Sequence, residues 1–174
     1  MENATIDEFK VWEYVRQIAS ALYHMETMRI MHRDLKPANI FIDSGGSLKV
    51  GDFGLGRQLS DQTAAAFSRV GTPLYMSPEL LNGSGYDWKN DVWSMGCIAY
   101  ELCTLRSPFK DKTEKLSLYD LFNRINAGEY DQIHDKYSMK LRNLINSMLR
   151  VNPEERASLQ EVVAVCDSEH KREK

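Results

Sequence analysis

The sequence predicts a mainly helical lobe that carries one small β-hairpin. Apolar residues recur at helical spacing along several segments that begin with capping residues. Two short apolar runs, 40–42 and 48–50, flank Asp43-Ser44-Gly45-Gly46, and turn residues between such runs are typical of a hairpin. The most apolar run, 92–105, is shorter than the roughly 18 residues of a membrane span and carries Glu101. We therefore expect it to be a buried helix around which the others pack.

The first half of the chain is expected to form one helix, the hairpin and a loop. The helix follows Thr5-Ile6-Asp7-Glu8, which has capping-box spacing, and continues to Met25. The hairpin separates Asn39 from Asp52 in sequence while allowing both side chains to face one site. Residues 55–77 lack a sustained period, so we expect a long loop, and loops of that length in compact domains are usually functional.

The second half is expected to be helical. Asn90 or Asp91 is predicted to cap the buried helix, which ends at Leu105. Further helices are predicted at 114–127, 138–149 and 158–166, the last two with serine caps. We expect one compact domain over 1–168 and a charged tail over 169–174 that frays.

Composition excludes several classes of function. The net charge is −3 with both signs mixed along the chain, which argues against nucleic acid or an anionic membrane as the main partner. The 3 cysteines form no CxxC pair, so we expect buried thiols in a reducing compartment rather than disulfides or a zinc site. The acidic first residues lack the basic and apolar regions of a signal peptide.

One segment carries most of the chemistry, His32-Arg33-Asp34-Leu35-Lys36-Pro37-Ala38-Asn39. Phosphoryl transfer needs a carboxylate near the attacking hydroxyl, which Asp34 can supply. It also needs Mg²⁺ on oxygen ligands, and Asn39 and Asp52 offer the hard oxygens that this ion prefers. Lys36 can place a positive charge beside the transferred phosphate, worth about 10²–10³ in rate when well aimed. Each residue alone would also fit an ordinary charged loop.

Three motifs in this order and spacing resemble the C-terminal lobe of the eukaryotic protein kinases: residues 32–39, Asp-Phe-Gly at 52–54 and Ser-Pro-Glu at 77–79. Lys36 and Gly71-Thr72-Pro73 resemble the serine/threonine branch. Residues 55–57, 70–79 and 91–97 resemble the NIMA-related (Nek) kinases. The likeness extends from Thr5 to about Cys166 and implies a protein-kinase-like C-lobe that helps to transfer the γ-phosphoryl group of ATP to protein Ser/Thr hydroxyls.

The resemblance implies a role for each matching site residue. Asp34 would be the catalytic base, and Asn39 and Asp52 would bind Mg²⁺. Lys36 would contact the transferred phosphate of ATP from the catalytic loop, and Thr72 would contact the substrate platform.

The resemblance also implies structural roles. His32 and Phe53 would stack in the apolar spine that joins the lobes, although either could be plain core. Asp91 would be a buried carboxylate that accepts backbone N–H bonds from the catalytic loop, with a simple helix cap as the rival interpretation. Glu79 and Arg156 resemble the family's buried ion pair.

The predicted loop contains candidate phosphorylation sites at Ser60, Thr63 and Ser68. Ser68 is favoured because its place four residues before Thr72 resembles the Nek activation serine. Arg33 is the residue that would pair with the added phosphate.

The sequence before His32 has no glycine-rich phosphate loop and no strand lysine, and Lys10 lies in a helical pattern. We therefore expect a C-lobe without its N-lobe, inactive as a polypeptide alone. The alternative is a non-catalytic kinase-lobe interaction module, and a metal-dependent hydrolase has no spacing of its own to support it. The resemblance implies protein substrates, with cell-division or microtubule-associated proteins as partners, and a cytoplasmic, nuclear or cytoskeletal location.

Overall fold

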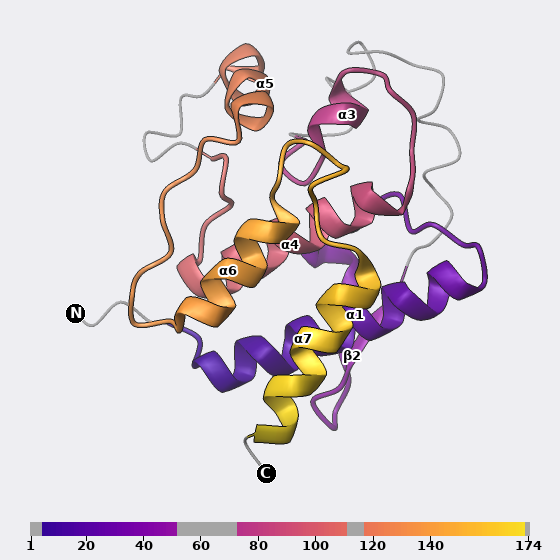
Figure 1. The fold of residues 1–174 in the computed structure, drawn as a ribbon, viewed down its shortest axis with the longest axis vertical. Helices are drawn as coiled ribbons and strands as arrows, with labels where there is room; N and C mark the ends of the chain where they lie inside the picture. The colour runs from indigo at the N-terminus through magenta and orange to yellow at the C-terminus, as the bar shows by residue number, and fades with distance from the viewer. Residues whose placement is uncertain (1–4, 52–72, 111–116, 173–174) are drawn as a thin grey trace.

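The computed structural model describes residues 5–51, 73–110 and 117–172 (Figure 1). Its described part is mainly helical, with one two-stranded antiparallel sheet, which confirms the predicted fold class. In chain order the elements are α1 (Glu8–Thr27), η1 (Pro37–Asn39), β1 (Ile40–Ile42), β2 (Leu48–Val50), α3 (Pro78–Leu81), α4 (Trp88–Thr104), α5 (Leu118–Ala127), α6 (Met139–Met148) and α7 (Leu159–Arg172). None of the helices in these ranges is long and apolar enough to cross a membrane.

Helix α4 is the core of the lobe, as its apolar sequence predicts. Every residue from Asn90 to Tyr100 is buried. Helices α1 and α6 both pack against α4, and α7 lies across α1 (Figure 1). Gly96 permits the contact with α6, because a Cβ there would lie 2.9 Å from Met148 Cβ and 3.0 Å from the Leu149 side chain. Any side chain at this position would force the two helices apart.

The hairpin forms with the predicted bounds. Ile40 pairs with Val50 and Ile42 with Leu48. The turn is closed by the Asp43 carboxylate, which accepts hydrogen bonds from the backbone N–H groups of Gly45 and Ser47, both at 2.9 Å. These local bonds explain why the turn sequence alone locates the hairpin.

Two predicted helix caps are wrong. Helix α1 is capped by Asp7, whose carboxylate accepts from Phe9 N, so the box expected to start at Thr5 does not form. Helix α4 is capped by Asp87 rather than by Asn90 or Asp91. Asn90 completes that capping box by accepting from the backbone N–H of Asp87 at 2.6 Å.

The later helices agree with the sequence pattern at their starts. Ser138 caps α6, and the Ser158 hydroxyl accepts from the backbone N–H of Glu161 at the start of α7. Helix α5 is capped by Ser117, and the predicted start at 114 lies outside the described residues. Helix α7 continues to Arg172, into the segment for which the sequence predicts a tail.

Candidate active site

The loop between α1 and η1 is attached to the buried end of α4 by one carboxylate. Asp91, 2% exposed, accepts backbone hydrogen bonds from His32 at 2.8 Å and from Arg33 at 3.1 Å. Arg33 has φ of 69°, and a left-handed residue lets successive N–H groups converge on one anion. Asp91 therefore fixes the backbone immediately before Asp34.

His32 connects this loop to the end of the hairpin. Its side chain is fully buried, and its Nδ1 accepts from the backbone N–H of Asp34 at 3.3 Å. Its Nε2 lies 2.8 Å from the carbonyl oxygen of Gly51. Because Nδ1 is an acceptor, the ring proton is on Nε2, which donates a hydrogen bond to the Gly51 carbonyl oxygen. His32 thus holds Asp34 near the strand that leads to Asp52.

Asp34, Lys36 and Asn39 lie together in this loop, with Asp34 and Lys36 partly exposed and Asn39 buried. The Lys36 ammonium is 2.8 Å from Asp34 Oδ2. Asn39 Nδ2 donates to the Asp34 carbonyl at 2.8 Å and to Asp34 Oδ2 at 3.2 Å. The 3-10 turn η1 reverses the chain and brings Asn39 back to Asp34. The Asp34 side chain remains 33% exposed, so a hydroxyl group in solution can reach its carboxylate.

Asn39 fits the donor chemistry of a magnesium site. Both of its hydrogen bonds to Asp34 are donated by Nδ2, which directs the amide oxygen away from that residue. An amide oxygen is a hard ligand of the kind that Mg²⁺ takes. Within residues 5–51, 73–110 and 117–172 there is no group of three or more His, Cys, Asp or Glu that could hold a metal ion. Asp52, the other predicted ligand, lies outside the described residues.

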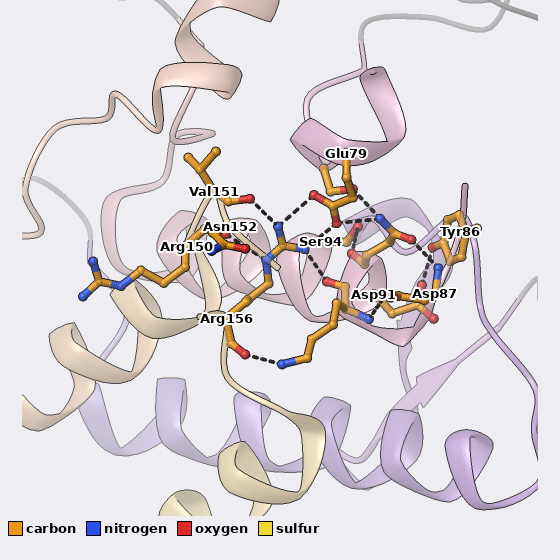
Figure 2. A network of polar contacts seen from close by, with 12 residues as sticks. Glu79, Tyr86, Asp87, Asp91, Ser94, Arg150, Val151, Asn152 and Arg156 are labelled. Atoms are coloured by element: carbon orange, nitrogen blue, oxygen red, sulfur yellow. Dashed lines mark hydrogen bonds and ion pairs between the residues drawn. The ribbon is translucent and has the colours of Figure 1, made fainter. Parts of the chain in front are cut away.

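A second polar cluster surrounds Arg156, which is 1% exposed (Figure 2). Its guanidinium makes a bidentate contact with Glu79, with N–O distances of 2.6 and 2.9 Å. The remaining N–H groups donate to the backbone carbonyls of Arg150 at 2.9 Å, Lys89 at 2.7 Å and Val151 at 3.2 Å. All of the donors of the guanidinium are therefore used.

Trp93 also contacts Arg156 in this cluster, and Glu79 supplies the opposite charge. The Arg156 guanidinium lies over the Trp93 ring, 5.0 Å from its centroid, at a distance typical of a cation–π contact. Burial raises the pKa of the Glu79 carboxyl, but the hydrogen bonds and charge of Arg156 outweigh burial and hold that pKa below its usual value. Glu79 is therefore an ionised partner, and α3 is tied to the segment between α6 and α7.

Residues 1–165 match the protein kinase domain. The chain belongs to the protein kinase family. It is 41% identical over 167 residues to probable serine/threonine-protein kinase nek3 of Dictyostelium discoideum, covering 94% of this chain and 14% of that protein. It is 39% identical over 167 residues to serine/threonine-protein kinase Nek2 of Homo sapiens, covering 93% of this chain and 37% of that protein. It is 37% identical over 181 residues to G2-specific protein kinase nimA of Emericella nidulans, covering 88% of this chain and 25% of that protein.

These comparisons confirm the resemblance to the Nek serine/threonine kinases that the motifs indicated. The chain spans between 14% and 38% of the length of the first relatives, so it corresponds to one part of each. The matched kinase domain contains all the described site residues, from the His32 loop to Arg156.

Sequence reasoning considered Asn90 only as a candidate helix cap and missed its contacts with Ser77 and Glu79. Asn90, 1% exposed, donates through Nδ2 to Ser77 Oγ at 2.6 Å and to Glu79 Oε1 at 2.7 Å. It therefore joins the start of α4 to the residues around α3. The sequence signal was the polar character of Ser77 and Asn90, but their contact joins residues far apart in the chain and no local pattern could pair them.

Several predicted site residues lie outside the described part of the kinase domain. They are Asp52, Phe53, Ser68 and Thr72. The described residue that was predicted to pair with a phosphate, Arg33, has its guanidinium carbon 5.9 Å from the centroid of the Tyr86 ring.

Proposed function

We propose that the chain forms the magnesium- and substrate-binding side of a serine/threonine protein kinase, which transfers the γ-phosphoryl group of ATP to protein Ser or Thr hydroxyls. The observation that carries the proposal is the cluster at Asp34. Its carboxylate is accessible, lies 2.8 Å from the Lys36 ammonium and is attached to a loop that is fixed by a buried aspartate. The relatives nek3 of Dictyostelium discoideum and Nek2 of Homo sapiens are named as serine/threonine-protein kinases.

In this proposal Asp34 orients the substrate hydroxyl and accepts its proton as the hydroxyl oxygen attacks the γ-phosphorus of ATP, whose bond to the bridging oxygen breaks so that ADP leaves. Lys36 places its positive charge beside Asp34, where it stabilises the negative charge of the transferred phosphoryl group. Asn39 holds the Asp34 side chain through its amide nitrogen. Mg²⁺ with ATP supplies the phosphoryl group and neutralises its charge, and Asn39 and Asp52 are the residues that would bind this ion.

The finer parts of the proposal concern the remaining predicted residues. Thr72 contacts the substrate platform, and phosphorylated Ser68 pairs with Arg33. Protein substrates include cell-division or microtubule-associated proteins, in keeping with the names of relatives such as G2-specific protein kinase nimA. The polypeptide is inactive alone, because its 174 residues contain no glycine-rich loop and strand lysine before His32.

The test is a phosphorylation assay with the full-length protein that carries this chain. Asp34→Asn should lower Mg-ATP-dependent phosphate incorporation by about 10²–10⁴-fold, because it removes the proton acceptor. Asp135→Asn is the matched control, since the Asp135 side chain is 83% exposed and lies outside the Asp34 cluster. Equal activity of wild type and Asp34→Asn would refute the proposal.

One observation favours the second candidate, a non-catalytic interaction module. An open apolar groove of about 300 Å³ lies between α1, the hairpin and the end of α4. The strand residue Ile42, which lines this groove, is 60% exposed. If full-length protein lacks activity while Ile42→Lys abolishes binding of a protein partner, this candidate replaces the kinase proposal.

A further inference from the structure

Tyr86 lies just before α4. It contacts the Arg33 side chain and also Asp91, whose carboxylate holds the Arg33 backbone. Its hydroxyl donates to Asp91 Oδ1 at 2.5 Å, the same oxygen that accepts the Arg33 backbone N–H at 3.1 Å. Its ring lies under the Arg33 guanidinium, with 5.9 Å between the guanidinium carbon and the ring centroid. Figure 2 shows Tyr86 beside Asp91 at the end of the polar cluster.

From this geometry we propose that Tyr86 is a positioning residue of the catalytic loop, which acts on Asp34 by fixing both the Arg33 side chain and the Asp91 carboxylate. This inference rests on the proposed function for the meaning of Asp34. The two contacts are chemically separate, because the hydroxyl binds the carboxylate and the π face binds the cation.

The physical need for such a residue follows from the conformation of Arg33. A left-handed φ of 69° is unfavourable for a residue with a Cβ, so the loop keeps this conformation only while surrounding contacts impose it. The Asp91 carboxylate imposes it through two backbone N–H groups. Tyr86 supplies a third hydrogen bond to that carboxylate and so holds it in the rotamer that faces the loop.

The protonation of Tyr86 agrees with this role. Burial raises the pKa of the Tyr86 phenol, and the negative charge of Asp91 raises it further. The phenol therefore stays protonated and acts as the donor in its bond with Asp91 throughout the neutral range. The Asp91 carboxylate therefore accepts three hydrogen bonds, two from backbone N–H groups and one from the Tyr86 hydroxyl.

Two substitutions separate the contacts. Tyr86→Phe removes the hydroxyl and keeps the ring, whereas Tyr86→Leu removes both. Tyr137→Phe is a matched control, because Tyr137 also donates its hydroxyl, to the Ile6 carbonyl at 2.8 Å, and also lies under a cation, with Lys136 Nζ 4.7 Å from its centroid. It lies outside the catalytic loop.

Hydrogen exchange of the full-length protein, followed by NMR, tests the hydroxyl contact without any need for activity. Tyr86→Phe should speed amide exchange at His32 and Arg33 by about tenfold to a hundredfold, the effect of losing one hydrogen bond to a charged group. The Leu141 amide, bonded to Ser138 Oγ in α6, should exchange as in wild type. Unchanged exchange at Arg33, or an equal rise at Leu141, would overturn the proposal.

Two further readouts test the ring contact and the link to catalysis. The Arg33 side-chain protons should show an upfield ring-current shift in wild type and Tyr86→Phe that is lost in Tyr86→Leu. In phosphorylation assays Tyr86→Phe should lower kcat about tenfold with KM for ATP unchanged, whereas Tyr137→Phe should keep the wild-type kcat. A wild type without phosphorylation activity would refute the proposed function alone, and wild-type exchange and kcat in Tyr86→Phe would refute the role of Tyr86.

Discussion

Replacing Arg156 by Met should destabilise the lobe by about 3–5 kcal/mol, the cost of leaving one partner of a buried ion pair uncompensated. Met keeps the length of the side chain and removes the charge. Glu79 would lose two charge-assisted bonds, of 2.6 and 2.9 Å, and would keep Asn90 as a donor at 2.7 Å. Backbone carbonyls that the guanidinium contacts, at Arg150 and Val151 among others, would also lose a donor.

Equilibrium urea unfolding followed by circular dichroism measures this change. With an m-value of about 2 kcal/mol per M, a loss of 3–5 kcal/mol moves the midpoint by about 1.5–2.5 M. Lys140→Met is the control, because Lys140 also pairs with a glutamate, Glu169, but its side chain is 37% exposed. Breaking that pair should cost less than about 1 kcal/mol. Equal midpoint shifts in the two variants would refute the argument that burial makes the Arg156 pair important.

The remaining predictions concern pH, packing and thiol reactivity. The folded-state pKa of Glu79 lies below its usual value of 4.5, so its stabilisation is present above that value and is lost as pH falls through the folded pKa. Urea unfolding as a function of pH should show this acid loss in wild type and a smaller one in Glu79→Gln, and identical slopes would contradict it. Gly96→Ala should destabilise by about 1–3 kcal/mol in the same assay, because its Cβ would lie 2.9 Å from Met148 Cβ, and an unchanged midpoint would show that α6 yields freely. Burial raises the pKa of the Cys103 and Cys166 thiols to about 12, so both should resist a thiol reagent at pH 8 until urea unfolds the chain. Rapid labelling of either thiol in the folded state would contradict their burial.

The parts of the fold that sequence predicts well are those fixed by neighbours in the chain. The hairpin bounds follow from Asp43, whose carboxylate bonds two nearby N–H groups, and from the two apolar runs on either side. Serine caps at Ser138 and Ser158 are local in the same way. The buried character of α4 follows from its continuous apolar sequence, which needs no knowledge of its partners.

The start of α4 was predicted wrongly because local sequence offers three polar residues that can cap a helix. In the structure Asp87 caps the helix, and Asn90 is its capping-box partner. Asp91 turns inward because the backbone N–H groups of His32 and Arg33 need an acceptor there. That demand comes from a loop 59 residues away, so no propensity at 87–91 could reveal it.

The contacts of the candidate site also fall into local ones, which the sequence predicts, and long-range ones, which it does not. Asp34, Lys36 and Asn39 lie within one short segment, and the motif itself implies that they meet. The contacts of Asn90 with Ser77 and of Tyr86 with Arg33 depend on how separate segments pack, and sequence reasoning did not find them. The predicted roles of Asp52, Phe53, Ser68 and Thr72 stay predictions, because these residues lie outside the described ranges.

In the proposed function Asp34 accepts the proton of a substrate hydroxyl during phosphoryl transfer. A single-turnover measurement on the full-length protein, with Mg-ATP bound before a Ser/Thr peptide is added, isolates that step from ATP binding. Asp34→Asn should lower the transfer rate constant by about 10²–10⁴-fold at unchanged ATP affinity. A rate constant equal to that of wild type would contradict it.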